Sequence, residues 1–167
     1  MTIESMVVAT AATATAALLA CGGVLAQEVA PAEDTRRGEL WLATGFATYH
    51  FKSDKDLNGR NPGVGVEYRF HRDASVALGR FYNSDRLHTR YAGVIYQPWS
   101  YQGVRFGGVI GAFDGYPRMR NGGWFPAVIP TATWEYQRVG INVAVIPKYK
   151  ERLYGGVSVQ LKFKLFE

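Results

Sequence analysis

The sequence predicts an all-β fold, namely an eight-stranded antiparallel up-and-down β-barrel of the outer-membrane type. Two observations lead to this prediction. From Gly38 onward the chain divides into segments of roughly ten residues in which apolar and polar side chains alternate, separated by clusters of Gly, Pro, Asp and Asn. The connections between these segments are alternately long and short, as in bacterial outer-membrane barrels, which have short periplasmic turns and longer external loops.

The composition agrees with a β protein and excludes two other classes. The chain has 167 residues, of which 47% are hydrophobic, 14% aromatic and 20% charged, which excludes a disordered chain. The mean hydropathy of -0.11 and the lack of a run of about 20 apolar residues beyond the N-terminal segment exclude a helical membrane protein. A membrane barrel remains, because its alternating strands keep the average hydropathy of a soluble protein. The net charge of +5 indicates an anionic partner.

The N-terminal segment has the features of a targeting signal. An apolar run rich in Ala and Thr ends at Ala26, with small residues where a signal peptidase reads, and polar residues follow it. We therefore expect a signal peptide over residues 1–26 and a short N-terminal segment over residues 27–37, before a barrel over residues 38–167. Cys21, the one cysteine, lies in a sequence similar to a lipoprotein box. It is either lipidated or, as we favour, lost with the signal peptide.

Eight strands follow one another in the expected barrel, without a linker or charge block between them, so a single antiparallel meander is the simplest arrangement. They are expected near residues 38–51, 63–71, 75–84, 87–97, 102–113, 124–136, 139–147 and 154–166. Longer polar loops follow every odd-numbered strand, at residues 52–62, 85–90, 114–123 and 148–153. Short turns follow the even-numbered strands, at Arg72 to Ala74, Pro98 to Tyr101 and Gln137-Arg138.

The second and the last strands show the two faces most clearly. In the second strand Val64, Val66, Tyr68 and Phe70 alternate with Gly65, Glu67, Arg69 and His71, and in the last strand Val157, Val159, Leu161, Phe163 and Leu165 alternate with Ser158, Gln160, Lys162 and Lys164. In a soluble sandwich the apolar face would be the core. In a membrane barrel the apolar face meets lipid and the polar face lies inside, and the unequal connections favour this second arrangement.

Aromatic residues near the strand ends fit a membrane barrel as well. The chain ends on an aromatic strand, with Phe166 next to last. Tyr and Trp residues expected in interfacial girdles are Trp41, Tyr49, Tyr82, Tyr96, Trp99, Trp124, Trp134, Tyr136, Tyr149 and Tyr154.

An eight-stranded barrel has a lumen that side chains just fill, or that holds one small ligand or acyl chain, so a porin-type channel is not expected. The long loops carry ten of the 19 basic residues: Lys52, Lys55, Arg60, Arg86, Arg90, Arg118, Arg120, Lys148, Lys150 and Arg152. Five acids accompany them: Asp54, Asp56, Asp85, Asp114 and Glu151. The positive charge therefore gathers at the presumed outer rim, where the side chains either pair with anionic lipid phosphates or are ordinary solvated loop residues.

One combination at this rim has catalytic chemistry. His50 ends the first strand and Asn83-Ser84-Asp85 ends the third, so the topology brings them to the same outer edge. A hydroxyl nucleophile near an imidazole base, with an amide or carboxylate to orient it, is the arrangement that acyl transfer needs. His88 also falls at this end, whereas His71 lies beside a short turn and is expected at the surface. Ser, Asn and Asp are common at strand ends for turn reasons alone.

Three prolines lie where strands are expected. Pro126 and Pro130 fall within the sixth strand and Pro147 ends the seventh, and each removes a donor from the hydrogen-bond ladder. We therefore expect strand pairing to be interrupted near the outer end of these two strands.

On these residues the chain resembles the lipid A palmitoyltransferase (PagP) family of small eight-stranded outer-membrane enzymes. The resemblance is carried by short motifs in the family's order and spacing: His50-Phe51-Lys52-Ser53-Asp54-Lys55-Asp56-Leu57-Asn58, Phe81-Tyr82-Asn83-Ser84, Trp124-Phe125-Pro126-Ala127-Val128-Ile129-Pro130 and Val145-Ile146-Pro147. The resemblance implies transfer of a palmitoyl chain from a phospholipid donor to a lipid A acceptor in the bacterial outer membrane.

The resemblance also implies roles for single residues. His50 is the expected base and Ser84 its partner, with Asn83 or Asp85 beside them. Either Arg86 or Arg90 is expected to stabilise the developing oxyanion. Arg118, Arg120 and Lys148 complete the basic rim that would hold the phosphorylated headgroup, and Pro126, Pro130 and Pro147 flank lateral openings through which lipids reach the interior. No metal, cofactor or nucleic acid is expected, and the protein is expected to act as a monomer.

Three positions depart from the family's pattern. The aspartate that precedes the family's serine is Asn83 here, and Asp85 is the available substitute. Residues 27–37 do not resemble the amphipathic helix that precedes the family's barrel. The strand-four glycine that sets acyl length in the family corresponds either to Gly93 or to Ile95, so the acyl-chain preference is left open.

Two further functions remain alternatives. A non-enzymatic outer-membrane barrel would bind lipopolysaccharide through its basic rim, and a lipocalin-like lipid carrier would be anchored through Cys21. Small barrels carry many functions, so the fold alone does not choose among these.

Overall fold

The computed structural model describes residues 38–52, 56–150 and 152–166. The expected signal peptide, Cys21 and the segment 27–37 lie outside these residues, as do Asp54, Lys55 and Glu151. Among the described residues no helix is long and apolar enough to cross a bilayer.

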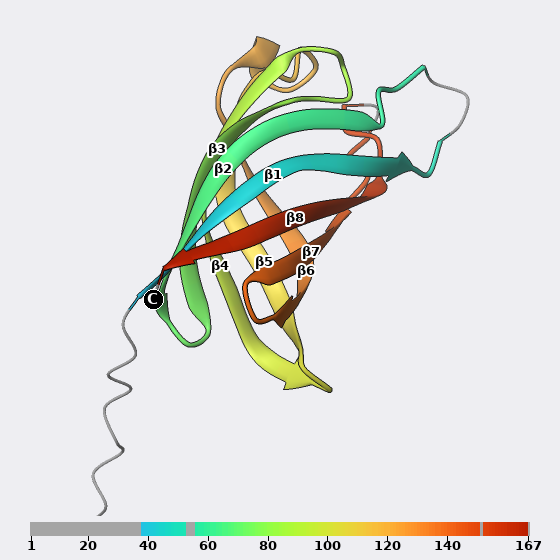
Figure 1. Cartoon of the computed structure of the whole chain (residues 1–167). Coiled ribbons are helices and arrows are strands. Elements are labelled where there is room, and N and C mark those ends of the chain that lie inside the picture. Colours follow the sequence, from blue (N-terminus) through green and yellow to red (C-terminus); the bar gives the residue numbers. More distant parts are fainter. Residues whose placement is uncertain (1–37, 53–55, 151, 167) are drawn as a thin grey trace, which may run out of the picture. The chain divides into compact units, whose positions relative to one another are not determined.

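Eight antiparallel strands form one closed barrel, in which each strand pairs with the next and β8 pairs with β1 (Figure 1). The strands are β1 (Glu39–His50), β2 (Arg60–His71), β3 (Ala74–Tyr82), β4 (His88–Tyr101), β5 (Val104–Phe113), β6 (Phe125–Tyr136), β7 (Val139–Ile146) and β8 (Gly156–Phe166). A single 3-10 turn, η1 (Arg120–Gly122), lies between β5 and β6. The prediction of an up-and-down eight-stranded barrel is confirmed.

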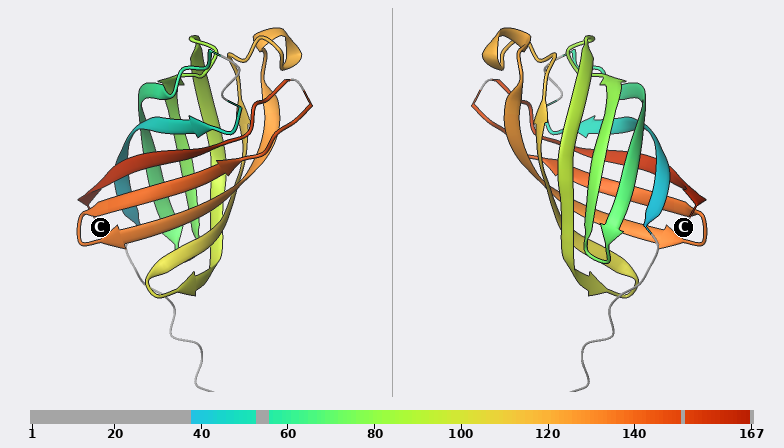
Figure 2. Two further views of the ribbon diagram at one scale, coloured as in Figure 1. Left: turned by 90° about the vertical axis from the view of Figure 1, so that its right-hand side faces the viewer. Right: turned by 90° about the vertical axis from the view of Figure 1, so that its left-hand side faces the viewer.

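The connections are unequal in the expected way. Long loops follow β1, β3, β5 and β7, at residues 51–59, 83–87, 114–124 and 147–155, whereas the turns after β2, β4 and β6 are short. Figure 2 shows the long loops gathered at one end of the barrel and the short turns at the other. We call these the loop end and the turn end.

One predicted turn is wrong. Residues 98–101 belong to β4, and the chain turns at Gln102 and Gly103, whose φ angles are +48° and +79°. The pairing of β4 with β5 shifts register between Tyr96 and Trp99, and this irregularity accommodates Pro98 inside the strand. Residues 60–62, expected in a loop, likewise belong to β2, whereas residues 88–90, where the expected strand 87–97 and the expected loop 85–90 overlap, belong to β4.

The apolar faces of the strands point outward and the polar faces point into the barrel. In β8, Leu161 and Phe163 are 44% and 42% exposed, whereas Gln160 and Lys162, which alternate with them, are buried. In β2, the buried Glu67 alternates with the exposed Tyr68. This arrangement is the inverse of a soluble sandwich and is that of barrels embedded in membranes.

The aromatic side chains divide between the two faces. Most of the expected girdle residues are exposed on the outer wall, among them Tyr49, Trp99 and Tyr136. Trp41 is an exception, because it is fully buried inside the barrel, and its assignment to a girdle is wrong. It lies on the inward face of β1, where its Nε1 donates to Glu39 at 3.1 Å.

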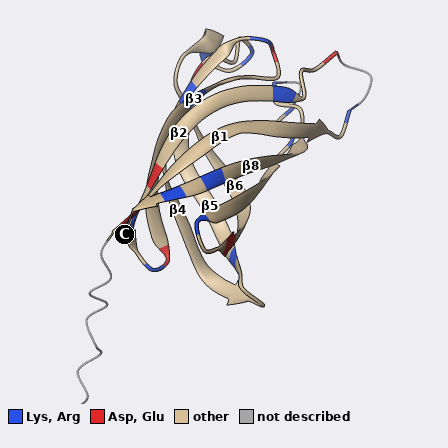
Figure 3. Cartoon of the chain, in the orientation of Figure 1, with Lys and Arg blue, Asp and Glu red and all other residues tan. Residues whose placement is uncertain are grey.

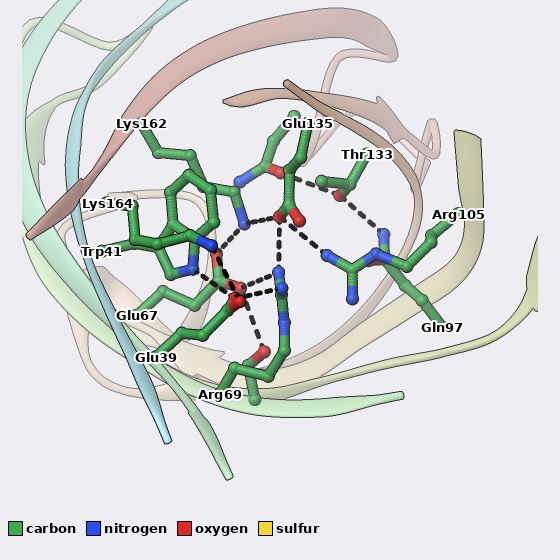
Figure 4. Close-up of polar contacts among 12 residues, drawn as sticks. Glu39, Trp41, Glu67, Arg69, Gln97, Arg105, Thr133, Glu135, Lys162 and Lys164 are labelled. Carbon is green, nitrogen blue, oxygen red and sulfur yellow. Dashed lines mark hydrogen bonds and ion pairs between the residues drawn. The ribbon is translucent and has the colours of Figure 1, made fainter. Parts of the chain in front are cut away.

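The turn end of the lumen is filled by a charged network (Figure 4). Its carboxylates are Glu39, Glu67 and Glu135, and its cations are Arg69, Arg105, Lys162 and Lys164. Nζ of the buried Lys162 lies 2.7 Å from Glu67 and 2.8 Å from Glu135, and Arg69 pairs with Glu39 and Glu135. Figure 3 shows the remaining charge mostly in the loops and turns. The network closes the lumen at this end by ion pairs between strands far apart in sequence.

Candidate functional site

The loop end of the barrel brings His50 and Ser84 together. His50 is the last residue of β1 and Ser84 follows the end of β3, two strands away. Nε2 of His50 and Oγ of Ser84 are 2.8 Å apart, a hydrogen-bond distance. The pair is partly buried. An imidazole in contact with a hydroxyl is the base and nucleophile arrangement of acyl-transfer sites.

A bulge in β1 turns His50 toward the interior. The pairing of β1 shifts register between Thr44 and Phe46 on its β2 side and between Ala43 and Phe46 on its β8 side. Before the shift Trp41 and Ala43 face inward, and after it Phe46 and Thr48 line the interior. Without the extra residue, His50 would lie on the outer face, since side chains alternate along a strand.

Gly45 makes this bulge possible. A Cβ at this position would lie 2.1 Å from the backbone oxygen of Asn61 and 2.3 Å from the backbone nitrogen of Gly63. Both contacts are with backbone of β2, which cannot move aside as the tip of a side chain can. The bulge therefore requires a residue without a side chain.

The turn that carries Ser84 is organised by Asn83, which is fully buried. Oδ1 of Asn83 accepts from the backbone N–H groups of Asp85 and Leu87, both at 2.9 Å. Its Nδ2 donates to Oγ1 of Thr89 at 3.0 Å and to the backbone oxygen of Gly115 at 2.8 Å. Both halves of the amide are used, and the side chain links the β3–β4 turn to the β5–β6 loop.

The loop after β1 also fixes Ser84. The backbone N–H of Asn58 donates to the carbonyl oxygen of Ser84 at 3.0 Å, and Nδ2 of Asn58 donates to the carbonyl oxygen of Asn83 at 3.3 Å. Neither contact was predictable, since Asn58 lies in a loop whose course the sequence does not fix.

These contacts separate the roles of Asn83 and Asp85. The Asn83 amide is committed to the turn and has no contact with the imidazole among the described residues. The carboxylate of Asp85, in contrast, acts electrostatically on His50 and on the phenol of Tyr116. Burial raises the pKa of Tyr116, and the charge of Asp85 raises it further, so the phenol stays neutral. Of the two candidates, Asp85 therefore supplies the negative charge beside the site.

Two of the basic residues expected to stabilise an oxyanion are engaged elsewhere. Arg86 pairs with Asp56, with Nη2 2.9 Å from each carboxylate oxygen, and this contact holds the pKa of Asp56 below its usual range. Arg90 binds Asp114 through Nε and Nη2 on the outer wall of β4, since Thr89 occupies the inward position beside it. The geometry does not bring either guanidinium to Ser84.

The other rim residues lie over β6, β7 and the loops that follow β5 and β7. The guanidinium of Arg118 lies 5.2 Å from the ring centroid of Tyr154, and thus joins the β5–β6 loop to the β7–β8 loop. Nη1 of Arg120 donates to the backbone oxygen of Trp124 at 3.3 Å, and Lys148 is exposed.

An apolar cavity of about 150 Å³ begins at Ser84 and Tyr116 and extends into the barrel. Its aromatic walls are in mutual contact: the ring centroids are 4.9 Å apart for Phe46 and Phe81, 6.0 Å for Phe81 and Tyr91, and 6.1 Å for Tyr91 and Phe113. The Ser84 hydroxyl therefore stands at the mouth of a pocket whose walls are largely apolar.

Ile95 and a chain of polar groups line the deep part of the cavity. Nε2 of Gln97 donates to Oγ1 of Thr133 at 2.8 Å, and Thr133 donates in turn to Oδ1 of Asn142 at 2.8 Å. Nδ2 of Asn142 donates to Gln160 at 3.2 Å. These groups satisfy one another at the floor of the cavity, where Glu67 of the charged network also lines it. Gly93 and Ile95 both line the cavity, and both positions considered from the sequence thus face inward.

Strand pairing is interrupted beside the cavity, between β6 and β7. These strands pair only from Thr131 with Ala144 to Tyr136 with Val139, so residues 125–130 of β6 have no partner in β7. Ala127 and Ile129 of this unpaired stretch line the cavity, as do Ile146 and Pro147 opposite. The expected interruption of strand pairing is therefore present, and the interior reaches it.

The prolines of β6 fit this open edge. Pairing with β5 continues without a shift through Pro126, Val128 and Pro130. Residues at alternate positions direct their backbone groups to the same side, and a proline has no N–H for a partner. Pro126 and Pro130 therefore remove two donors from the side that faces the gap, which makes an unpaired edge less costly in an apolar surrounding.

Within the described ranges, no group of three or more His, Cys, Asp or Glu side chains is arranged to hold a metal ion. Sequence reasoning identified His50, Ser84 and the prolines. It missed the bulge, Asn58, the aromatic walls of the cavity and the charged network, all of which depend on which strands become neighbours.

Comparison with known proteins supports the assignment of the fold and gives no information on the site. No protein-family model and no curated protein matches the chain. Among solved structures, it is similar to the solution NMR structure of de novo designed TMB2.3, with a TM-score of 0.57 and 14% sequence identity, covering 78% of this chain and 96% of that chain. TMB2.3 is a designed transmembrane β-barrel. At this identity the likeness is one of fold, and the chain is a closed, eight-stranded, antiparallel up-and-down β-barrel.

Proposed function

We propose that this protein is an outer-membrane acyltransferase that moves a palmitoyl or similar chain from a phospholipid to lipid A, as a divergent relative of the PagP family. One observation carries the proposal. The His50 and Ser84 side chains, 2.8 Å apart, stand at the mouth of an apolar cavity that reaches an unpaired stretch of the barrel wall. A hydroxyl, a base, an apolar pocket and a lateral path from the bilayer are the parts that such a transfer needs.

The chemistry follows from this geometry. Oγ of Ser84 attacks the ester carbonyl carbon of the donor phospholipid while Nε2 of His50 accepts the hydroxyl proton. The ester C–O bond breaks, and the imidazolium returns the proton to the leaving oxygen of the lysophospholipid. A lipid A hydroxyl then attacks the acyl-serine, with His50 again accepting and returning a proton. The negative charge of Asp85 stabilises the imidazolium in both steps.

The two alternatives differ from this proposal in what they leave unexplained. A soluble lipid carrier would expose the apolar outer face, including Leu161 and Phe163, to water. A barrel that only binds lipopolysaccharide would have no use for a His–Ser contact above an apolar pocket. It nevertheless accounts for the exposed basic rim, so the test below must separate binding from chemistry.

The test is the mass of lipid A from a bacterial host that lacks such an enzyme and expresses this chain. The proposal expects an added acyl chain on lipid A with the wild type, and none with Ser84→Ala or His50→Ala. Ser100→Ala and His88→Ala are matched controls, because both side chains are exposed and lie away from the cavity. Heat-modifiable migration in a gel confirms that each variant is folded. Unmodified lipid A with a folded wild-type barrel in the outer membrane would rule the proposal out.

A further inference from the structure

Two arginines face each other on the outer wall of the barrel. Arg80 of β3 pairs in register with Arg90 of β4, and both side chains point outward and are exposed. Directly opposite residues of an antiparallel pair have Cβ atoms about 5 Å apart, and like charges in such a pair destabilise it. The sequence alone does not reveal this pair, because it depends on the register of the β3–β4 hairpin.

The two arginines differ in their surroundings. Arg90 is held in place, with its Nε 2.7 Å from the Asp114 carboxylate and its guanidinium 5.4 Å from the ring centroid of Trp124. Its side chain is still 69% exposed. Arg80 has no hydrogen-bond or ion-pair partner in the described part of the chain. Together with Asp114 the two arginines leave one uncompensated positive charge at this point of the wall.

The position of Arg80 and Arg90 along the barrel axis indicates which group could compensate their positive charge. Below the arginines, the next outward pair is Leu78 with Ala92, and above them it is Tyr82 with His88. Arg80 lies two residues below the loop end of β3, about 7 Å along the strand. The arginines therefore mark the level at which the apolar wall gives way to the polar rim. In a membrane-spanning barrel this is the level of the lipid headgroups.

We propose that Arg80 and Arg90 hold the phosphate group of a membrane lipid on the outer wall of β3 and β4. The guanidinium groups supply paired N–H donors that suit phosphate oxygens, and an anion between them relieves their repulsion. The exposed Leu78 below Arg80, and the exposed Val64 opposite Arg80 on β2, provide a surface for the acyl chains of the same lipid. A free phosphate ion would gain nothing from that surface, so the occupant is a lipid.

This site is distinct from the candidate catalytic site. Arg80 points away from the lumen, whereas its neighbours Gly79 and Phe81 lie on the inward face, and Phe81 lines the cavity. The inference rests on the membrane location in the proposed function but not on the acyl transfer itself. A lipid held here would be a bound neighbour of the barrel rather than a substrate in the pocket.

The test uses the full chain, folded in neutral maltoside micelles with diphosphoryl lipid A as the probe, and counts retained lipid by native mass spectrometry. Arg80→Gln should lower lipid retention about tenfold or more, since hydrogen bonds between charged partners are lost. Arg80 has no partner among the described residues, so this variant should fold like the wild type, as its heat-modifiable migration would confirm. Arg80→Lys should retain an intermediate amount, because lysine keeps the charge without the paired donors. Arg138→Gln, an exposed residue at the turn end, is the control and should retain as much as the wild type.

Three further measurements test whether the lipid phosphate is bound at Arg80 and Arg90. Dephosphorylated lipid A should be retained weakly and equally by all variants, and excess inorganic phosphate should displace the lipid only weakly. Ser84→Ala should keep full retention even though the proposed function expects it to lose acyl transfer. Equal retention of diphosphoryl lipid A by Arg80→Gln and the wild type overturns the site, whether or not the wild type transfers an acyl chain. Retention that depends on Arg80 in a barrel without transferase activity supports the site and contradicts the proposed function.

Discussion

Replacing Lys162 by Met should strongly destabilise the barrel, because it leaves a buried carboxylate without its main partner. Lys162 and Glu67 are 1% and 4% exposed and lie 2.7 Å apart. After the substitution Glu67 keeps only the Ser75 hydroxyl at 3.0 Å and Arg69 at 3.7 Å. Breaking a buried ion pair from one side costs about 3–5 kcal/mol, and the remaining partners place the expected loss at about 3 kcal/mol.

Urea unfolding of the barrel in vesicles measures this loss. A change of about 3 kcal/mol corresponds to a fall in the midpoint of about 1–2 M urea. Trp41 is a built-in reporter, since its ring lies 4.6 Å from Nζ of Lys162 and is fully buried. Lys164→Met is the matched control and should cost less, because Lys164 is more exposed and its partner Glu39 also pairs with Arg69.

A double variant identifies the cause. Lys162→Met combined with Glu67→Leu removes both charges and should recover most of the lost stability, because replacing a buried ion pair by apolar residues is often close to neutral. The reasoning is refuted if the single variant lies within about 0.5 kcal/mol of the wild type, or if the double variant is less stable than the single one.

Substitutions at four more positions test the candidate site and its cavity. Asn83→Asp should slow acyl transfer and lower thermal stability by about 1–3 kcal/mol, since it removes two donors from buried acceptors; a fully active, stable variant would show that the amide does not position Ser84. Asp85→Asn should lower kcat about tenfold, equal to about 1.4 kcal/mol of lost transition-state stabilisation, with unchanged gel migration; an unchanged kcat contradicts its electrostatic role. Ile95→Ala should shift the acyl chains found on lipid A toward longer ones and Ile95→Phe toward shorter ones, and identical chain-length profiles would mean that Ile95 does not limit the cavity. Gly45→Ala should abolish activity in a barrel that still closes, because His50 loses its inward position, and wild-type turnover would contradict the role of the bulge.

Much of the fold could be predicted from the sequence because one physical rule governs it. The alternation in β8 distinguishes Leu161 and Phe163 from Gln160 and Lys162, and the unequal loops then indicate which face meets lipid. The prediction fails at Trp41 and Pro98, and both failures involve irregular strands. Trp41 precedes the bulge of β1, and Pro98 lies at the register shift of β4, so a rule of strict alternation or of proline as a turn residue does not apply there.

The candidate site could be predicted only in part, for a similar reason. His50 and Ser84 were found because each ends a strand at the same edge, which topology alone dictates. The charge of Arg90 was assigned to the site, yet it lies on the outer wall, because neighbouring residues of a strand face opposite sides. Asn83 was grouped with the catalytic residues by position, whereas its contacts place it in the turn. The position of a residue in the chain predicts at which end of the barrel it lies. Whether its side chain points into the barrel or outward depends on the strand register.

A barrel of eight strands has a small interior. In this barrel its contents follow a definite order along the axis. The charged network fills the turn end, the hydrogen-bonded amides of Asn142 and Gln160 lie above it, and the apolar cavity lies above these. The amides at the floor of the cavity bond to one another, so the walls above them can be largely apolar. The bulge at Gly45 then turns one histidine into that apolar part, and the open edge at Pro126 and Pro130 connects it with the outside. Both features depart from the regular barrel at a cost in strand pairing, and both adjoin the same small volume beside Ser84. Regular strands alone would build the same barrel with His50 facing outward, so the bulge is what brings the imidazole to Ser84.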